Sequence, residues 1–318
     1  MKNSQLHAAP EVSVIIPVQN NAKDIVETVD CVLSQSYSAS EVIVVDMGST
    51  DGSAALIEEQ RGECICLVHQ MSTDLSSARN LGASVAKYEV LVFLGVGDQW
   101  EPHFLEEIIK LYHEFPEARC YSTAYQLTEG DDTFIDPNLP LLKRVKSKAL
   151  LDNYFDSCSQ GASPLMISSF CIRKSELPNV GLFPKNEAVG ADQDFLARAA
   201  LKSTIAYSPS VLAFYDSEPK GCLDQKVIPV TECTFSKNIY HWANEEGRPM
   251  GLKESMLNYT ASHLLRLVDL NVSLGRINAA RNILSDSRCK RQPLRYFWSA
   301  VKCWFLKHMA SRQESIVT

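Results

Sequence analysis

The chain has 318 residues, 45% hydrophobic and 22% charged, which is enough apolar sequence to bury a full core. Its net charge of −7 argues against a general nucleic-acid-binding protein, because such a protein presents a basic face to the phosphates. The polar start MKNSQLHAAPEVS does not resemble a signal peptide, and runs such as VLVFLGV are too short to span a bilayer. We therefore expect a cytoplasmic protein, either soluble or attached to a membrane surface.

The ten cysteines do not predict a metal site. They are scattered along the chain except for Cys64 and Cys66, whose spacing is not C-x-x-C and which have no second pair to join. In a cytoplasmic protein, isolated cysteines are expected to stay reduced and to pack as small hydrophobic residues.

Strands and helices alternate in the first part of the chain. Apolar, β-branched runs predict strands at 12–18, 41–46, 64–69 and 88–94. Helical periodicity follows each of them, at 22–35, 52–60, 75–86 and 102–115. The strand runs are apolar on both faces, so we predict an α/β fold with a mostly parallel sheet and helices on both of its faces. Ligands bind such sheets beyond the carboxyl ends of the strands, which selects the loops 17–20, 46–51 and 95–100.

After residue 125 this alternation weakens. Residues 126–165 are polar, and we expect loops and an insertion over the edge of the sheet. The later patterns predict a strand leading into a helix at 167–177, a helix at 190–203 and a strand at 205–215. Beyond residue 216 we predict helices, with an antiparallel pair at 253–270 and 277–286. The expected domains are therefore an α/β domain, 1–215, and a helical C-terminal region, 216–318.

The loop after the second strand, 46–51, is rich in Asp, Ser and Thr. These side chains either contact a ligand or act as turn and helix-cap residues, and the sequence alone leaves both alternatives open. No G-x-G-x-x-G follows the first strand and no G-x-x-x-x-G-K-[ST] occurs, which argues against dinucleotide and Walker-type phosphate sites.

Four segments, in order, resemble the motifs of family 2 glycosyltransferases, which have the GT-A nucleotide-sugar fold. VSVIIPVQN resembles the opening strand and its P-V-Y-N loop, and EVIVVDMGSTDGS resembles V-V-D-D-G-S-T-D-G. ARNLGASVAKYEVLVFLGVGDQW resembles A-R-N-x-G…F-L-D-x-D-D-x-W, and VGADQDFLARAA resembles G-E-D-x-D-L-x-x-R. The resemblance spans about 200 residues. It implies an inverting transfer of a sugar from a nucleoside-diphosphate donor to an acceptor hydroxyl.

The resemblance also implies roles for individual residues. Asp192 matches the general base that takes the proton of the acceptor hydroxyl, and a carboxylate at a helix start is also favoured by the helix dipole alone. Arg198 closes the same motif. The residues that correspond to nucleotide contacts are Pro17, Val18, Asp46, Arg79 and Asn80.

The metal motif is the main departure from the family pattern. Family members hold Mg²⁺ or Mn²⁺ on the D-x-D carboxylates, because these hard cations take oxygen ligands and balance the charge of the leaving diphosphate. Here Gly95 and Gly97 stand at those positions, and Trp100 fixes the register. The next aspartate of the motif, Asp98, remains, and alone it would hold a divalent cation weakly.

Three interpretations of the departures stay open. The chain is an active transferase in which Asp98 holds a cation or Arg79 or Arg173 replaces it. Alternatively, it is a degenerate relative that binds a nucleotide, a glycan or a partner enzyme without turnover, or an active enzyme with a changed donor pocket. We favour activity, because Asp192 is retained, with a glycan or lipid-linked acceptor in cell-surface polysaccharide or glycolipid synthesis. The other departures are Gln19 for an aromatic residue, Met47 for an aspartate, Ala191 for a glutamate, and FYDSEPKGC without a histidine.

Residues 288–312 contain seven Lys and Arg and no acidic residue. Phe297, Val301, Trp304 and Phe305 fall on one face of a helix, with basic residues beside or opposite them. This composition suits a helix that lies on an anionic membrane, which would place the protein on the inner face of the cell membrane. It also suits a helix that packs on the domain with its cations in water, and the sequence leaves both alternatives open.

Overall fold

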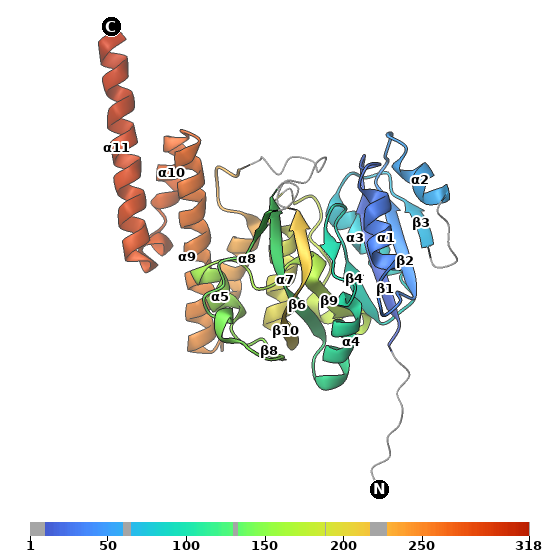
Figure 1. Cartoon of the computed structure of the whole chain (residues 1–318). Helices are drawn as coiled ribbons and strands as arrows, with labels where there is room; N and C mark the ends of the chain where they lie inside the picture. The colour runs from blue at the N-terminus through green and yellow to red at the C-terminus, as the bar shows by residue number, and fades with distance from the viewer. Residues whose placement is uncertain (1–9, 60–64, 130–132, 188, 217–227, 318) are drawn as a thin grey trace.

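The computed structural model of the chain describes residues 10–59, 65–129, 133–187, 189–216 and 228–317. A mixed sheet forms its centre, and helices flank the sheet and continue after its last strand (Figure 1). The strands are β1 (Val12–Val18), β2 (Glu41–Asp46), β3 (Ile65–His69), β4 (Val90–Phe93), β5 (Gln99–Trp100), β6 (Cys120–Glu129), β7 (Thr133–Ile135), β8 (Ala149–Leu150), β9 (Phe170–Arg173) and β10 (Ile205–Asp216). The α-helices are α1 (Ile25–Leu33), α2 (Ser53–Glu59), α3 (Leu75–Val85), α4 (Phe104–Glu114), α5 (Tyr154–Gln160), α6 (Leu177–Val180), α7 (Ala191–Lys202), α8 (Thr234–Ala243), α9 (Met250–Ser273), α10 (Ile277–Leu284) and α11 (Pro293–Val317).

The strand order is β3-β2-β1-β4-β9-β6-β10-β5, with β7 paired to β6 and β8 paired to β10. Strands β1 to β4 run parallel, as do β6 and β10, whereas β9 is antiparallel to both β4 and β6. The parallel strands bring their carboxyl ends to one edge of the sheet, where the connecting loops meet. The predicted α/β class, with a mostly parallel sheet, is confirmed.

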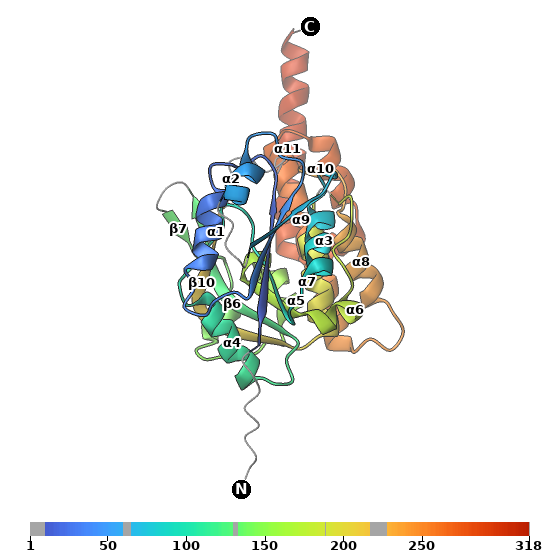
Figure 2. The ribbon, with the colours of Figure 1, turned by 90° about the vertical axis from the view of Figure 1, so that its right-hand side faces the viewer.

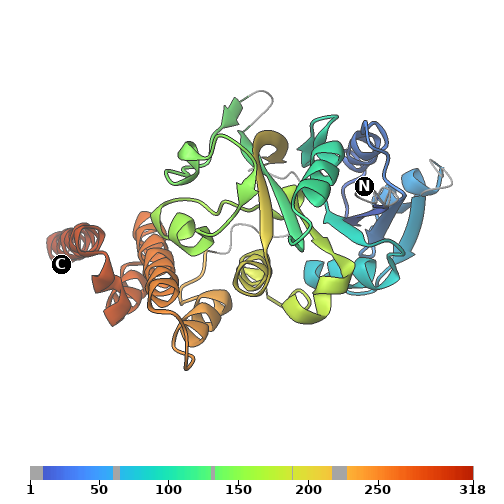
Figure 3. The ribbon, with the colours of Figure 1, turned by 90° about the horizontal axis from the view of Figure 1, so that it is seen from below.

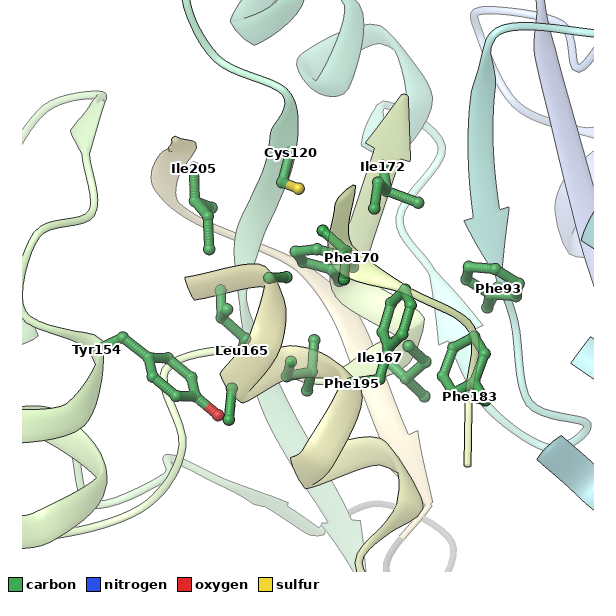
Figure 4. Close-up of a cluster of buried hydrophobic side chains, with 14 of the residues drawn as sticks. Phe93, Cys120, Tyr154, Leu165, Ile167, Phe170, Ile172, Phe183, Phe195 and Ile205 are labelled. Atoms are coloured by element: carbon green, nitrogen blue, oxygen red, sulfur yellow. The ribbon is translucent and has the colours of Figure 1, made fainter. Parts of the chain in front are cut away.

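Helices cover both faces of the sheet, as the two-sided apolar runs predict. Helices α1 and α4 pack on one face through residues such as Ile25, Val29 and Ile108, which share a core with the side chains of β1 that point the same way. Helices α3 and α7 cover the opposite face (Figure 2). On that face three aromatic rings meet above β4: Phe183 stacks on Phe195 at a centroid distance of 3.9 Å, and Phe93 meets Phe183 edge-on at 5.0 Å (Figure 4).

The C-terminal helices lie at the end of the sheet opposite β1 to β3 (Figure 3). Helix α8 and the first part of α9 belong to the same hydrophobic core as the sheet, through residues such as Phe235, Met256 and Tyr259. The second part of α9 packs with α10 and α11 in a separate cluster that includes Leu265 and Cys303. The helical C-terminal region is confirmed, and its predicted helix pair corresponds to α9 and α10.

The expectation of loops from residue 126 is wrong for the first residues of that segment. Strand β6 continues to Glu129 and forms a hairpin with β7, and α5 follows later in the same segment. The sequence hides β6 because its third and fourth residues are Ser122 and Thr123, which are polar but fully buried. The Ser122 hydroxyl donates to the carbonyl of Ser169 at 3.0 Å, so a polar side chain is satisfied inside the sheet.

Candidate functional site

A cavity of about 990 Å³ opens at the carboxyl edge of the sheet and reaches across to helix α9. Its walls come from the ends of β1, β2, β4 and β10, the first turns of α3 and α7, and one face of α9. The sequence predicts a ligand site at this edge, and the cavity lies there. Of the residues singled out from the sequence, Pro17, Arg79, Asp98 and Asp192 line the cavity.

Arg79 and Asp192 form an ion pair in the cavity wall. The Arg79 side chain is only 6% exposed, whereas the Asp192 side chain is 30% exposed and reaches the cavity. The guanidinium of Arg79 also lies over the ring of Phe183, 5.2 Å from its centroid, so packing fixes its position. The pair therefore presents one accessible carboxylate that is held in place by a buried cation.

The chain conformation before α7 explains how Asp192 reaches the cavity. Gly190 precedes the helix with a φ of +95°, and a Cβ there would lie 2.5 Å from the ring of Phe235. Only glycine suits both conditions. Asp192 in the first turn is paired with Arg79, whereas Arg198 lies six residues further along α7. Arg198 instead donates to the carbonyls of Val180 and Leu182 at 2.6 and 2.7 Å.

Asn80 does not line the cavity, because its carboxamide is used elsewhere. Its Nδ2 donates to the carbonyl of Phe183 at 2.9 Å, and its Oδ1 accepts the Phe183 amide, also at 2.9 Å. Both ends of the side chain are thus engaged by one residue far along the chain. Asn80 holds the segment whose ring covers Arg79, and a direct contact with a nucleotide stays a prediction.

Asp46 and Val18 are also buried away from the cavity. The Asp46 carboxylate accepts the amide of Ser49 at 3.1 Å and lies 3.3 Å from Nδ1 of His69. The other polar side chains of this loop bond to the loop after β1: the Ser49 hydroxyl accepts the Asn20 amide at 3.0 Å. These contacts favour the turn-forming alternative for the 46–51 loop, and Met47 is its member that lines the cavity.

Asp98 occupies the space that Gly95 leaves free. A Cβ on Gly95 would lie 2.7 Å from Oδ2 of Asp98, so no larger residue fits there while the carboxylate keeps its place. The Ser168 hydroxyl donates to Oδ2, and the Asp216 amide donates to Oδ1 at 3.1 Å. Burial raises the pKa of Asp98 to about 7, although these two hydrogen bonds act in the opposite direction.

The described side chains do not form a Mg²⁺ or Mn²⁺ site by themselves. Mg²⁺ is usually held by one or two carboxylates together with substrate phosphates and water, and Gly95 and Gly97 supply no carboxylate. Both oxygens of Asp98 already accept hydrogen bonds from protein groups. Among the described residues, no group of three or more His, Cys, Asp and Glu side chains is arranged to hold a metal ion.

Arg173 does not take the place of a metal ion in this cavity. Strand β9 is antiparallel to β4, and Arg173 pairs with Val90 at the start of that strand, at the opposite edge of the sheet. There its guanidinium lies 4.2 Å from the ring centroid of Tyr112 and donates to the hydroxyl of Tyr121 at 2.7 Å. In the described part of the cavity wall, the cationic side chains are Arg79 and Arg266.

Several lining residues are not evident from the sequence. Oε1 of Gln19 is buried without a hydrogen-bond partner among the described residues, at the end of β1. Helix α9 contributes a wall that includes Tyr259, His263 and Arg266. For Gln19 the available sequence signal is that it replaces the aromatic residue of the P-V-Y-N loop. The amphipathic pattern of α9 indicates only a packed helix, because residues that face a cavity and residues that face a core recur at the same spacing of three and four.

The basic C-terminal segment forms helix α11, which packs and also exposes apolar residues. One face, with Ser299 and Cys303, is buried against α9 and α10. The cations near this face contact acidic residues of the body: Nζ of Lys302 lies 3.3 Å from Asp269, and Arg291 pairs with Glu254. The opposite face exposes large side chains, namely Leu294, Phe297, Trp298, Val301, Trp304 and Phe305. Within the described residues, no helix is long and apolar enough to cross a membrane.

The sheet order, the two helical layers and a cavity at the carboxyl edge define the GT-A nucleotide-sugar transferase fold. Residues 13–164 match the family described as Glycosyl transferase family 2. The recognition made from the four motifs is confirmed.

Similar proteins agree with this assignment. An uncharacterised glycosyltransferase of Nostoc sp. is 35% identical over 129 residues, which cover 40% of each chain. An uncharacterised glycosyltransferase of Rickettsia prowazekii is 33% identical over 211 residues, which cover 64% of this chain and 63% of that protein. The match thus spans less than two thirds of the length of either relative.

Solved structures show the same fold over nearly the whole chain. Residues 1–349 of S. aureus TarS, solved in complex with UDP-GlcNAc, superpose with a TM-score of 0.70. The superposition covers 96% of this chain and 92% of that chain at 17% sequence identity. At this identity the similarity establishes the fold alone.

Proposed function

We propose that the protein is a glycosyltransferase that moves a sugar from a nucleoside-diphosphate donor to an acceptor hydroxyl. The observation that carries this proposal is the Arg79–Asp192 pair, which presents an accessible carboxylate in a cavity at the carboxyl edge of the sheet. A solved structure with the same fold holds UDP-GlcNAc, which supports a nucleotide-sugar donor.

Asp192 acts as the general base in this proposal. It takes the proton of the acceptor hydroxyl as the oxygen bonds to the anomeric carbon of the donor. The bond from that carbon to the diphosphate breaks at the same time, and its electron pair leaves with the diphosphate. Attack from the side opposite the leaving group inverts the anomeric configuration. Arg79 is a positioning residue for Asp192, because the ion pair and the Phe183 ring hold its guanidinium in the wall.

Arg79 also offers positive charge to the diphosphate of the donor, so that no metal ion is needed in this proposal. A guanidinium has five N–H donors, so Arg79 can keep its contact with Asp192 and still donate to a phosphate oxygen. Oε1 of Gln19, which has no hydrogen-bond partner in the described part of the chain, is an acceptor for an N–H group of the nucleobase. We infer that these two side chains bind opposite ends of the nucleotide and that Asp98, held by Ser168 and Asp216, shapes the wall between them.

Isothermal titration with UDP and then GDP, each with and without Mn²⁺, tests the donor site. We expect one of them to bind with an affinity that Mn²⁺ changes by less than about twofold, because no described ligand set fits the ion. Binding that requires Mn²⁺ would contradict our proposal that Arg79 supplies the positive charge that faces the diphosphate. Failure of both nucleotides to bind would contradict the transferase proposal.

Turnover tests the base. With a donor found by screening, Asp192→Asn should lower kcat by about 10²- to 10⁴-fold and leave nucleotide affinity unchanged. Asp30→Asn, which alters an exposed carboxylate on α1, is the matched control and should behave as the wild type. Nucleotide binding without turnover of any donor would favour the degenerate alternative, a protein that binds nucleotide, glycan or a partner enzyme.

We further propose that the exposed face of α11 attaches the protein to an anionic membrane and that the acceptor is a glycan or lipid-linked sugar of cell-surface polysaccharide or glycolipid synthesis. The support is the aromatic side chains Phe297, Trp298 and Phe305, which are exposed together on one face. Such side chains are favoured at the boundary between lipid headgroups and acyl chains.

A further inference from the structure

Helix α9 forms the wall of the cavity that faces away from the first strands. Six of its residues line the cavity, at spacings of one, three or four that place them on a single helical face: Tyr259, Ser262, His263, Arg266, Leu267 and Leu270. The other face of the helix is buried against α10 and α11. The segment that matches the glycosyltransferase family ends at residue 164, so this wall comes from outside it.

The two halves of the cavity differ in polarity. The half built by the sheet carries charged residues, among them Arg79, Asp98 and Asp192. The half built by α8 and α9 is mainly apolar. Its lining side chains include Cys158, Ile228, Pro229, Cys233, Phe235, Tyr259, Leu267 and Leu270. A nucleoside diphosphate suits the first half better, because in the second half Arg266 is surrounded by apolar side chains against which the phosphates would lose hydration.

His263 is one of three polar residues on the α9 wall, with Ser262 and Arg266. Its Nε2 is buried and has no hydrogen-bond partner among the described residues. The ring packs edge-on against Phe235 at a centroid distance of 4.6 Å. Burial lowers the pKa of His263 to about 3, and Arg266 and Arg288 add to the effect, so the imidazole is neutral at pH 7. A neutral ring nitrogen without a partner is suited to a hydroxyl group of a ligand.

We infer that the α8–α9 wall is the acceptor subsite and that the acceptor is a glycoside with an apolar aglycone. The aglycone lies along Phe235, Leu267 and Leu270, and a sugar hydroxyl bonds to Nε2 of His263. Asp192 lines the same cavity. The inference rests on the proposed function, because it assigns the second substrate of the same reaction.

Titration with n-octyl β-D-glucoside below its micellar concentration, compared with methyl β-D-glucoside, tests this assignment. We expect the octyl glycoside to bind at least about tenfold more tightly, because its extra methylene groups leave water. Leu270→Glu should weaken that binding by about tenfold or more, because it puts a charge on the apolar wall. His263→Leu should weaken it by about two- to tenfold through the lost hydrogen bond.

Two matched variants separate the cavity from other apolar surfaces. Leu274→Glu changes the leucine that follows the last residue of α9, four positions after Leu270; it is 49% exposed against 37% for Leu270 and does not line the cavity. Trp298→Glu changes the exposed face of α11. Both should bind the octyl glycoside as the wild type does. Equal binding of the two glycosides, or weakening by Leu274→Glu or Trp298→Glu as large as that by Leu270→Glu, would overturn the inference.

Nucleotide titration of the same samples keeps the two proposals distinguishable. If UDP or GDP binds normally and the octyl glycoside does not, the acceptor assignment fails and the proposed function stands. If the octyl glycoside binds at the α9 wall and neither nucleotide binds, the cavity takes an apolar glycoside, and the inference fails as a statement about an acceptor because the transfer reaction has lost its donor.

Discussion

The contact between Gly95 and Asp98 can be measured as a coupling energy. In Gly95→Ala the new methyl group would lie 2.7 Å from Oδ2 and 3.3 Å from Cγ of Asp98, so the carboxylate must move by several tenths of an ångström. That movement stretches its hydrogen bonds with Ser168 and with the Asp216 amide. Overpacking of this kind costs about 1–3 kcal/mol, and the gain from restricting the unfolded chain offsets about 0.4–1 kcal/mol of it. We expect a net loss of about 1–2 kcal/mol.

A double-mutant cycle isolates the interaction energy between the new methyl group at position 95 and the Asp98 carboxylate. In an Asp98→Ala background the obstructing carboxylate is gone, and Gly95→Ala should be neutral or stabilise by up to about 1 kcal/mol. Urea denaturation followed by tryptophan fluorescence measures all four proteins, because buried Trp100 lies beside the contact and donates to the Ser168 carbonyl at 2.6 Å. Gly251→Ala, at a helical position with open space around it, is the control and should have the same effect in both backgrounds. An equal cost of Gly95→Ala in both backgrounds would refute the placement of the Asp98 carboxylate.

Three further results are expected. Asn80→Ala should destabilise the fold by about 1–3 kcal/mol in urea titrations, because it leaves the buried Phe183 amide and carbonyl without their partners; an unchanged midpoint would contradict this. Between pH 6.5 and 3 the unfolded chain binds a proton on His263 that the folded chain does not. Lowering the pH through this range therefore lowers the free energy of unfolding, by about 2 kcal/mol at pH 5 relative to pH 7. His263→Leu should remove that part of the pH dependence of the melting temperature, and equal slopes for both proteins would argue against a neutral His263. Trp298→Glu should reduce flotation with anionic liposomes, and Leu274→Glu should leave it unchanged.

The sequence predicts the parts of the fold in which local pattern and final environment agree. Strands β1 and β4 are continuous apolar runs because both of their faces are buried. The first four residues of β6 lie equally deep, and there the hydroxyls of Ser122 and Thr123 are satisfied by carbonyls, Ser122 by that of Ser169 and Thr123 by that of Ala124. Hydropathy alone cannot reveal such a strand, because the partners that make its polar residues tolerable are set by the tertiary structure.

The same limit applies to the site. Asp98 could be selected because it follows a strand at the carboxyl edge of the sheet, and Arg79 and Asp192 because their segments resemble the motifs of the family. Asn80 belongs to the same motif as Arg79, but its carboxamide is held by Phe183, 103 residues away. The α9 wall of the cavity could not be predicted from the sequence, because the residues on its cavity face have the same spacing as those on its core face. The nucleotide-binding roles of Pro17, Val18, Asp46 and Asn80 stay predictions.

The origin of α9 outside the family-matched segment has a consequence for how this protein can be altered. At 1.5 Å per residue its 24 residues form a rod of about 36 Å, one side of which faces the cavity. Of the six positions that line the cavity, Leu267 and Ser262 would be kept, because Leu267 packs with α10 and the Ser262 hydroxyl accepts a hydrogen bond from Arg295 of α11. Substitutions on the cavity face of α9 would therefore vary the proposed acceptor subsite while strands β1 to β4, Arg79 and Asp192 remain as they are. This makes the helix the natural place to redesign selectivity for the acceptor.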